Sequence, residues 1–455
     1  MAGRGLGRGL LIQQRFIKPK KTMNKKSFQA VRGMRDILPD DQRYWEKVRR
    51  IIGKVAETYD FARIDTPILE NVDLFVKGTG AFTDIVEKEM FALRTKGGDK
   101  LVLRPEFTPS VIRAYLENGL SRLPHPVKLY SIGPIFRYER PQSGRYRQSE
   151  QASFETIGEK DPVLDAQLIQ LFFSISGELG LKRLVTQINS VGCPQCAPNY
   201  KKSLLTFLRK VKNGLCSDCQ RRLKQNPLRL LDCKNEKCAQ LTEDAPQVID
   251  SLCGECHNHF KSVLEYLDEL EIPYILNSRL VRGLDYYTKT VFEIWPEEKD
   301  GRQIALAGGG RYDGLVKLLG GRETQAVGFA IGLDRMIALM KERKIKAPSK
   351  ARASVFLVQL GDLGKKKSLS LFEKLQKAGI KTATSFNRDR MTTQLKIANK
   401  LGSRFALILG QKEALDETII VRDMISGIQE VVPMAKIINV LKKKIKSKLV
   451  VKRLD

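Results

Sequence analysis

Histidine is scarce in this sequence, and two common nucleotide-binding loops are missing from it. The three histidines are His125, His257 and His259, which argues against a histidine-based catalytic triad, a zinc-protease helix or a polyhistidine metal centre. The sequence has no Gly-x-x-x-x-Gly-Lys-Ser/Thr loop and no Gly-x-Gly-x-x-Gly segment that opens a helix. Any nucleotide must therefore be bound without a P-loop or a Rossmann turn.

Acidic residues are outnumbered, and long apolar runs are absent. No window approaches the roughly 18 uninterrupted apolar residues of a membrane span, so we expect a soluble protein without membrane contact. The 80 Lys and Arg residues against 51 Asp and Glu residues give a net charge of +29. Clustered cations gain free energy by displacing counterions from a polyanion, so this charge indicates nucleic acid as a partner.

The amino-terminal end is strongly basic. Residues 1–35 contain ten Lys and Arg residues and no acid. We interpret residues 1–27 as a disordered basic extension, with a targeting signal as the alternative. A single Thr and no Ser precede Met23, which argues against a transit peptide. Met23 is an alternative start of the chain.

The length of 455 residues predicts about two to four domains, and apolar spacing predicts a mixed α and β chain. From Asp40, apolar residues recur at intervals of three and four, which predicts an amphipathic helix. These residues are Trp45, Val48, Ile52, Val55 and Tyr59. Strand-like segments separated by Gly and Pro predict an antiparallel sheet. The segments are 89–93, 101–103, 126–138, 147–157, 290–295 and 302–308.

The composition and the apolar pattern of the sequence change after Met340. A charged stretch with one Pro and no apolar period predicts a linker. Beyond it, short apolar strands such as Val355–Val358 and Phe405–Leu409 alternate with helical stretches. This alternation predicts a small α/β domain with parallel strands over about residues 352–455.

All eight cysteines lie in one stretch, as four close pairs. The pairs are Cys193 with Cys196, Cys216 with Cys219, Cys233 with Cys238, and Cys253 with Cys256. Cytosolic thiols stay reduced, so this spacing indicates thiolate ligation of structural zinc. Two four-cysteine sites made from consecutive pairs are the simplest partition, while crossed pairs and substitution by His257 or His259 stay open. The alternative is a set of reduced core thiols.

Three short segments each place an arginine beside a strand end or a glycine turn. Guanidinium groups offer a planar fork to phosphate oxygens and keep their charge, so a site without a glycine-rich loop needs them. The segments are Gly133–Gln148 with Arg137, Leu280–Tyr287 with Arg282, and Gly328–Arg335 with Arg335. Singly, each arginine is also compatible with a solvated rim charge.

Together these segments resemble the class II aminoacyl-tRNA synthetases. Phe136-Arg137-x-Glu139 is similar to their motif 2, and Gly328–Arg335 is similar to motif 3. Three further segments resemble the histidine-specific signatures of the histidyl-tRNA synthetases. These are Arg104–Thr108, Arg282–Thr288 and Ala307–Gly314. The resemblance covers about residues 28–440.

The resemblance implies an α+β fold and a homodimer. We expect a class II synthetase antiparallel sheet core with flanking helices, a helical Cys-rich insertion and a C-terminal α/β anticodon-binding domain. The expected boundaries are 1–27 for the extension, 28–190 for the first catalytic part, 191–272 for the insertion, 273–342 for the second catalytic part, 343–351 for the linker and 352–455 for the anticodon-binding domain.

The resemblance also implies a two-step histidine–tRNA ligase that uses ATP with Mg²⁺, L-histidine and tRNA(His). On the nucleotide side, Arg137 and Arg282 stabilise charge on the α-phosphate, and Arg335 clamps the γ-phosphate. Glu139 lies near the adenine or a bound Mg²⁺. Fixed cations at the reacting phosphate are expected to supply most of the acceleration.

On the amino acid side, the resemblance implies six binding residues. They are Glu106 and Thr108 for the ammonium group, Gln151 for the carboxylate, Glu155 and Tyr287 for the imidazole, and Tyr312, which closes the pocket. The glycine run 308–310 is expected to approach the substrate with its backbone, with a tight turn as the alternative. Before Gln151 the family often has a His, where this chain has Glu150.

Four exposed polar residues are candidates for tRNA contact: Arg140 and Gln142 after motif 2, and Arg388 and Lys396 in the last domain. Splayed bases could stack on Phe386, with a solvated turn as the alternative. The family also has a catalytically inactive paralogue that regulates the first enzyme of histidine biosynthesis. That paralogue typically lacks the last domain and the motif arginines, which are present here. A pure RNA-binding scaffold explains the charge but not the histidine signatures.

Overall fold

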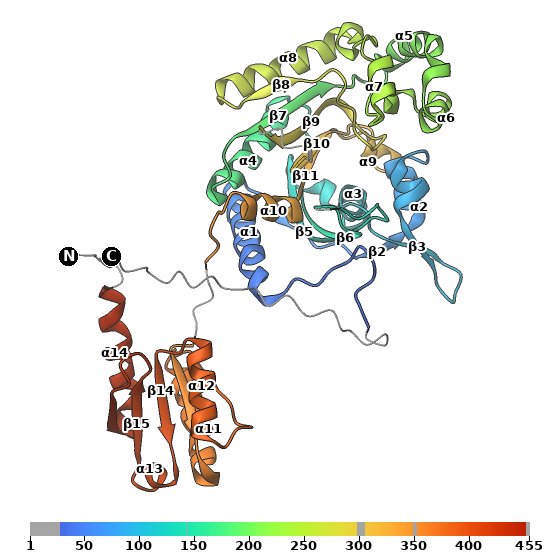
Figure 1. Ribbon diagram of the computed structural model, residues 1–455. Helices are drawn as coiled ribbons and strands as arrows, with labels where there is room; N and C mark the ends of the chain where they lie inside the picture. Colours follow the sequence, from blue (N-terminus) through green and yellow to red (C-terminus); the bar gives the residue numbers. More distant parts are fainter. Residues whose placement is uncertain (1–27, 143, 298–304, 349–352, 452–455) are drawn as a thin grey trace, which may run out of the picture. The chain divides into compact units, whose positions relative to one another are not determined.

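The computed structural model describes four stretches of the chain (Figure 1): 28–142, 144–297, 305–348 and 353–451. The chain divides into two compact units, Met1–Ala347 and Pro348–Asp455. The expected extension, residues 1–27, lies outside the described stretches, as do residues 349–351 of the expected linker. Within these stretches, every helix is too short or too polar to cross a membrane.

An eight-stranded sheet forms the centre of the first unit, in the spatial order β1-β5-β6-β11-β10-β9-β7-β8. Its strands are β1 (Ala62–Arg63), β5 (Val127–Phe136), β6 (Gln148–Ile157), β7 (Leu184–Ser190), β8 (Tyr274–Leu276), β9 (Thr288–Pro296), β10 (Ala307–Arg311) and β11 (Ala326–Gly332). The inner strands pair antiparallel, whereas the short edge strands β1 and β8 run parallel to their neighbours. The expected antiparallel core is therefore confirmed.

A second, three-stranded sheet has the order β2-β4-β3. Its strands are β2 (Leu69–Asn71), β3 (Phe91–Arg94) and β4 (Lys100–Leu103). Two segments that we expected in the main sheet, 89–93 and 101–103, thus pair locally instead, because a tight turn joins β3 to β4. In that turn, Thr95 Oγ1 lies 2.9 Å from Asp99 Oδ2. The segment expected at 302–308 is a strand only from Ala307, and residues 302–304 are not described.

Four helices pack against the main sheet to form the largest core: α1 (Pro39–Thr58), α4 (Val163–Leu179), α8 (Gly254–Glu269) and α10 (Leu333–Glu342). The helix expected from Asp40 is confirmed as α1. Its residues Trp45, Val48, Ile52 and Val55 are buried, as their spacing predicts, while Tyr59 caps the end of the helix.

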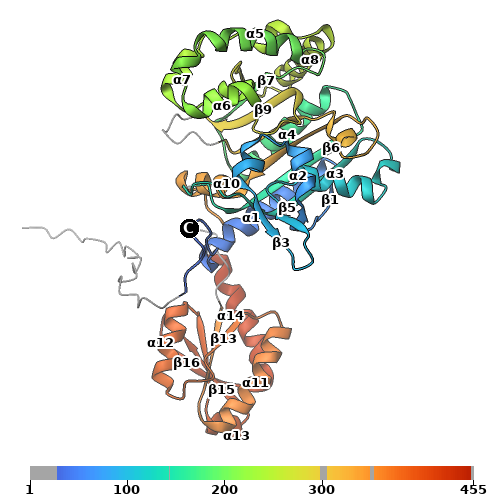
Figure 2. The ribbon, with the colours of Figure 1, turned by 90° about the vertical axis from the view of Figure 1, so that its right-hand side faces the viewer.

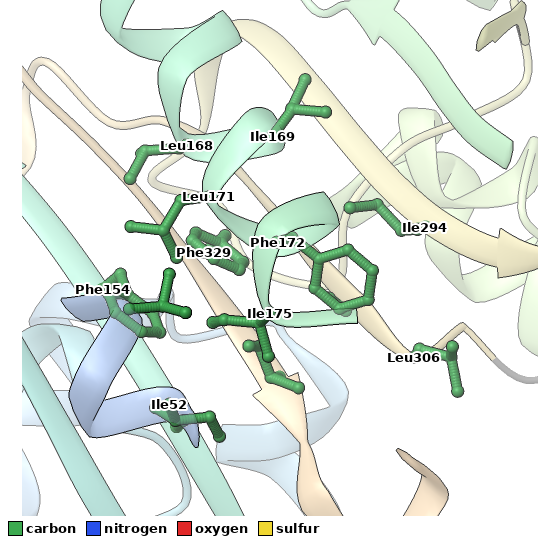
Figure 3. Close-up of a cluster of buried hydrophobic side chains, with 14 of the residues drawn as sticks. Ile52, Phe154, Leu168, Ile169, Leu171, Phe172, Ile175, Ile294, Leu306 and Phe329 are labelled. Carbon is green, nitrogen blue, oxygen red and sulfur yellow. The ribbon is translucent and has the colours of Figure 1, made fainter. Parts of the chain in front are cut away.

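Aromatic side chains hold this core together (Figure 3). Phe154 on β6 and Phe329 on β11 stack with ring centroids 5.1 Å apart. Phe172 of α4 meets Phe329 edge-on at 6.4 Å. Full burial of one such ring stabilises the fold by about 1.5–3 kcal/mol, so the neighbouring strands are firmly fixed. The residues on β6 and β11 that line the site are therefore held in fixed positions.

A second core gathers around α3 (Thr108–Glu117), with Phe107, Ile112 and Tyr115 buried. Along β5, Leu129 packs in this core and Tyr130 in the first, as the two-residue period of a strand requires. The remaining helical elements here are α2 (Val72–Thr79), the π-helix Ile85–Glu89, the 3₁₀ turn Leu120–Arg122 and α9 (Leu315–Leu318).

The segment between β7 and α8 forms a small helical lobe with its own core. Figure 2 shows its helices gathered at one end of the first unit, beyond β7 and β9. They are α5 (Ala197–Lys210), α6 (Ser217–Gln225) and α7 (Glu236–Leu241), with 3₁₀ turns at Lys212–Gly214, Pro227–Leu230 and Val248–Ser251. Tyr200, Leu204 and Leu230 are buried inside the lobe.

The second unit is a five-stranded sheet in the order β13-β12-β14-β15-β16. Its elements are β12 (Val355–Gln359), α11 (Gly361–Lys377), β13 (Thr382–Thr384), α12 (Met391–Leu401), β14 (Phe405–Leu409), α13 (Gln411–Leu415), β15 (Thr418–Asp423), β16 (Gln429–Pro433), the 3₁₀ turn Met434–Lys436 and α14 (Ile437–Val451). The first three strands are parallel, as expected, but β15 and β16 run antiparallel. A short turn joins these last two strands, so no crossover helix separates them.

Candidate active site

A pocket opens over β6, β10 and β11 and carries most of the charge that the motifs supply. The charged and amide side chains that line it are Arg137, Glu139, Arg145, Glu150, Gln151, Arg282, Glu293, Asp334 and Arg335. The structure therefore brings together the three motif arginines, which lie far apart in the sequence. The antiparallel order of the sheet makes this possible, because β5, β10 and β11 are near neighbours in space.

Arg137 and Arg335 are oriented by backbone carbonyls. Arg137 follows β5, and its Nε atom donates to the carbonyl of Pro105 at 2.8 Å. Arg335 lies in the first turn of α10 and donates through Nη1 to the carbonyl of Ala305 at 2.8 Å. Burial and the nearby Arg145 charge lower the pKa of Arg335 to about 10, so it stays cationic at neutral pH. A bound anion would offset both burial and the Arg145 charge, and would raise the pKa of Arg335 again.

Arg282 forms an ion pair with Glu293 of β9. Burial opposes its charge, but the Glu293 carboxylate together with Tyr287 and Tyr286 outweighs burial and raises the pKa of Arg282 above its ordinary value. The glycine run is part of strand β10 and not a tight turn. A Cβ atom on Gly308 would lie 2.7 Å from Arg282 Nη1, so a side chain at this position would displace the Arg282 guanidinium.

Two carboxylates are buried beside the arginines. Glu106 accepts from Thr79 Oγ1 at 3.0 Å and from the Tyr286 hydroxyl at 2.8 Å. Burial raises the pKa of Glu106, although the charges of Arg137 and Arg282 act in the opposite direction. Glu106 therefore lies close enough to both arginines for their charges to act on it.

Glu155 on β6 is the second buried carboxylate. It accepts from Thr108 Oγ1 at 2.9 Å and Ser153 Oγ at 2.6 Å, and the Tyr312 hydroxyl also donates to it. Burial raises the pKa of Glu155 to about 7, and these hydrogen bonds only partly offset that effect. Thr108, which we expected beside Glu106, is thus hydrogen-bonded to Glu155.

Tyrosine 286 was not selected from the sequence, although it lies inside the Arg282–Thr288 signature. It is the tyrosine that binds Glu106, whereas Tyr287 lies beside it with ring centroids 4.7 Å apart. The Tyr287 ring also lies 5.8 Å from the Arg282 guanidinium. The two tyrosines are adjacent in one signature, so the sequence did not show which of them would contact the Glu106 carboxylate. Arg145 was missed although it lies inside the Gly133–Gln148 segment, and Glu293 was missed because it lies outside every motif.

Gln151 lines the pocket from β6. Its Oε1 atom is buried and has no hydrogen-bond partner in the described stretches, which leaves the amide to a ligand. Glu150 stands where the family often has a His. Its carboxylate takes a two-point ion pair from Arg49 of α1, with the shorter contact at 2.6 Å, and its amide donates to Asp334. The negative charge of Glu150 is therefore already neutralised by Arg49.

The eight cysteines form two groups of thiols, in a nested and not a consecutive arrangement. The outer group is Cys193, Cys196, Cys253 and Cys256, and the inner group is Cys216, Cys219, Cys233 and Cys238. The simplest partition by sequence was wrong, because the lobe folds back so that its two ends meet. All eight thiols are free, and the sulfurs of each group lie within 4.8 Å of one another.

The sulfur spacing suits tetrahedral zinc. Cys193 Sγ lies 3.6 Å from Cys196 Sγ and 3.9 Å from Cys253 Sγ. Four ligands at the usual Zn–S distance would be about 3.8 Å apart. Neither group includes a histidine within the described stretches. His259 is buried and lies 3.5 Å from the Asp165 carboxylate instead.

The candidate tRNA contacts are exposed. Arg140 and Gln142 lie in the loop after β5, and Arg388 and Lys396 lie on the second unit. The Arg388 carbonyl accepts from Gln359 and Gln394 side chains, which fixes the backbone there while leaving the guanidinium outside. Phe386 is 38% exposed, enough for a base to stack on its ring.

Comparison with known proteins places the chain in a family. Residues 33–336 match the family model of histidyl-tRNA synthetase, and residues 354–444 match that of an anticodon binding domain. A histidine–tRNA ligase of Dehalococcoides mccartyi is 44% identical, over 92% of this chain and 100% of its own. One of Desulforamulus reducens is 42% identical, over 90% and 98%.

Solved structures agree with this assignment. The apo histidyl-tRNA synthetase of S. aureus is 33% identical with a TM-score of 0.75, and the match covers 91% of this chain and 99% of that one. An ATP phosphoribosyltransferase regulatory subunit/histidyl-tRNA synthetase from Bacillus halodurans, 19% identical with a TM-score of 0.57, shares the fold alone. With the pocket and its arginines, these matches establish that the chain belongs to the histidyl-tRNA synthetase family.

Proposed function

We propose that this chain is a histidine–tRNA ligase, which uses ATP to join L-histidine to the 3′ end of tRNA(His). The observation that carries the proposal is the meeting of permanent cations with buried carboxylates in one site. Arg137, Arg282 and Arg335 line the pocket, and the charges of the first two reach Glu106. Histidine-tRNA ligases at 42–44% identity over most of the chain support the same activity.

The arginines act on the nucleotide. The histidine carboxylate attacks the α-phosphorus of ATP, and pyrophosphate leaves. Arg137 and Arg282 lie where they can neutralise the charge that builds on the α-phosphoryl oxygens, while Arg335 holds the γ-phosphate. Because these side chains are oriented by Pro105, Glu293 and Ala305 before substrate arrives, little reorganisation is needed in the transition state.

Magnesium ions would enter with the nucleotide. Glu139 and Glu293 line the pocket and offer the oxygen ligands that Mg²⁺ prefers. Both are now paired with arginines, Glu139 with Arg145 at 3.4 Å and Glu293 with Arg282, so a cation would compete with those pairs. When bound, Mg²⁺ would neutralise phosphate charge.

The buried carboxylates act on the amino acid. Glu106 would bind the α-ammonium group, and Glu155 would accept a hydrogen bond from the imidazole, with Tyr287 at the second ring nitrogen. Thr108 orients Glu155 here, and Tyr312 does the same from the other side. Gln151 would bind the carboxylate through its free amide. An amino acid lacking the ring N–H would place a group that cannot donate against Glu155, which penalises its binding.

The second step consumes the adenylate. The terminal hydroxyl of tRNA attacks the histidyl carbonyl, and AMP leaves. We infer that Arg140 and Gln142 contact the acceptor end and that Arg388 and Lys396 contact the anticodon. The second unit matches an anticodon-binding model, which supports that assignment. We also propose a cytoplasmic homodimer, as the family resemblance implies.

Each cysteine group would hold one structural zinc ion. Four thiolates leave no open position for substrate, so the metal would fix the lobe and take no part in catalysis. The regulatory paralogue is the competing function. Its typical lack of motif arginines and of the last domain favours the ligase here, since this chain has both.

Histidine-dependent exchange of pyrophosphate into ATP tests the proposal. We expect the purified chain to exchange with L-histidine and not with other amino acids, and to charge a tRNA(His) transcript. A regulator or an RNA scaffold would bind RNA or a partner protein without any exchange, and that result would contradict the assignment.

A further inference from the structure

The stretch between Cys219 and Cys233 of the inner cysteine group packs its leucines into the core of the lobe and places polar side chains against the catalytic part. Three polar side chains in this stretch face that way: Arg222 on α6, Asn226 just after α6, and Arg229 in the following 3₁₀ turn. Arg229 is only 13% exposed, which is unusual for a lone surface arginine and indicates an ordered contact.

Both arginines converge on one carboxylate. Arg222 Nη2 and Arg229 Nη2 lie 2.8 and 2.9 Å from the same Oδ2 atom of Asp84. Burial alone would raise the pKa of Asp84, but the two arginines outweigh it and lower the pKa. Asp84 precedes the π-helix Ile85–Glu89 and follows α2 by a few residues. The contact therefore pins the chain immediately after α2.

Asn226 makes the second contact. Its Nδ2 atom donates to Asp285 Oδ1 at 2.8 Å, and the Asp285 amide donates to the carbonyl of Thr79 at 3.0 Å. The Asp285 side chain rests against Gly80, where a Cβ atom would lie 2.4 Å from Oδ2. Asn226 thus holds the point at which the end of α2 meets the Arg282–Thr288 signature.

Those two segments hold the Glu106 carboxylate between them. Thr79 donates to its Oε1 atom at 3.0 Å, and Tyr286, next to Asp285, donates to Oε2 at 2.8 Å. Asn226 contacts Asp285, and both donors to Glu106 are linked directly to Asp285. Tyr286 is the next residue in the chain, and the Thr79 carbonyl accepts from the Asp285 amide.

We propose that the stretch between Cys219 and Cys233 is a clamp on the amino acid pocket, set in place by a zinc ion at the inner cysteine group. Asn226 and Arg229 are positioning residues, which act on Glu106 through Thr79 and Tyr286. The proposal rests on the proposed function, because it takes Glu106 as the ligand of the histidine ammonium group. It assigns the inner metal a role on the small substrate, in addition to folding the lobe.

The first test is Asn226→Ala, with Lys224→Ala as the matched control, since Lys224 is an exposed cation on the same helix. Loss of one hydrogen bond to a carboxylate should raise the histidine KM in pyrophosphate exchange about tenfold and leave the ATP KM within about twofold. Lys224→Ala should leave both constants unchanged. A merely structural defect would move the two KM values together.

The second test exchanges donor and acceptor. Asn226→Asp places a carboxylate against Asp285 and should weaken histidine binding more than Asn226→Ala does. Adding Asp285→Asn restores a donor–acceptor pair across the same contact, so the double variant should recover much of the lost affinity for histidine. Recovery identifies the contact itself as the cause.

The third test removes a ligand of the inner metal. Cys233→Ser should release one of the two zinc ions, measured by mass spectrometry of the purified holoprotein, and reproduce the histidine-selective rise in KM. Zinc-free wild type, or a Cys233→Ser protein that keeps wild-type KM for histidine, would overturn the role of the metal. Unshifted KM in Asn226→Ala, with exchange intact in the wild type, would overturn the clamp alone. Absence of exchange in the wild type would instead overturn the proposed function.

Discussion

The two ends of the proposed site keep their charge in different ways: three arginines line the pocket, while two carboxylates are buried next to it and do not line it. Arg137, Arg282 and Arg335 remain cationic at neutral pH, even where burial lowers a pKa. Glu106 and Glu155 are fully buried, and burial raises the pKa of each. The nucleotide end is therefore ready for an anion at any working pH, whereas the amino acid end depends on protonation and on the cationic ligand that it binds.

Replacing Arg282 by Ala tests the nucleotide end and should have the largest effect. It removes a permanent charge from the reacting phosphate and leaves Glu293 unpaired. We expect pyrophosphate exchange to fall by about 10²–10³-fold, because one preorganised donor at a transition-state oxyanion is worth that much. The affinity for tRNA(His), measured by filter binding at fixed salt, should stay nearly unchanged.

Arg282→Lys is the informative control for this variant. It keeps the charge but not the planar fork, so partial activity would separate the two contributions. A parallel loss of exchange and tRNA affinity would instead mean that Arg282 supports the fold of β9 and β10, and the comparison between the two ends would lose its nucleotide half.

Local motifs allowed the convergence of the three arginines to be predicted, because each arginine lies in a short segment with its own glycines and strand. The period of Trp45, Val48 and Ile52 likewise predicted α1. The amino acid end was predicted less completely. That Thr108 binds Glu155 and not Glu106 depends on how α3 meets β6, which no local pattern encodes.

Contacts between distant segments account for the other differences. The nesting of the cysteine groups follows from the path of the lobe, in which Cys193 returns to Cys253. The spacing of the two cysteines within each pair is a local feature, and it predicted metal ligation. Which pairs share one group depends on the tertiary fold, so the sequence did not show it. In the same way, strand alternation at 89–93 and 101–103 indicated strands without naming their partners.

Replacing Glu155 by Gln tests the amino acid end through pH. A raised pKa means that the folded protein holds the proton more tightly than the unfolded chain. The stability from Glu155 is thus fully present below its ordinary value and is lost as pH rises through about 7. Glu155→Gln has no such loss. Its free energy of unfolding should therefore rise by about 2–3 kcal/mol relative to that of wild type between pH 5 and pH 8.

Urea unfolding followed by tryptophan fluorescence measures this gain. Both tryptophans, Trp45 and Trp295, lie in the first unit, so the signal reports on the unit that contains Glu155. Glu57→Gln, an exposed position on α1, is the control and should show no pH-dependent difference. Equal stability of Glu155→Gln and wild type at both pH values would mean that Glu155 stays ionised, and that the two ends do not differ in this respect.

The ion pair between Arg49 and Glu150 should have the smallest effect, because Glu150 is a pocket carboxylate that is already neutralised. Arg49 is 37% exposed and Glu150 20%, so water screens much of their attraction. We expect Arg49→Ala to cost about 1 kcal/mol of unfolding free energy and to change the exchange rate by less than about threefold. Lys54→Ala, which breaks the more exposed pair with Glu178 on the same helix, should cost less. If Arg49→Ala instead slowed exchange as much as Arg282→Ala, the charge of Glu150 would need Arg49 to remain harmless to the nucleotide, and the pair would belong to the working part of the site.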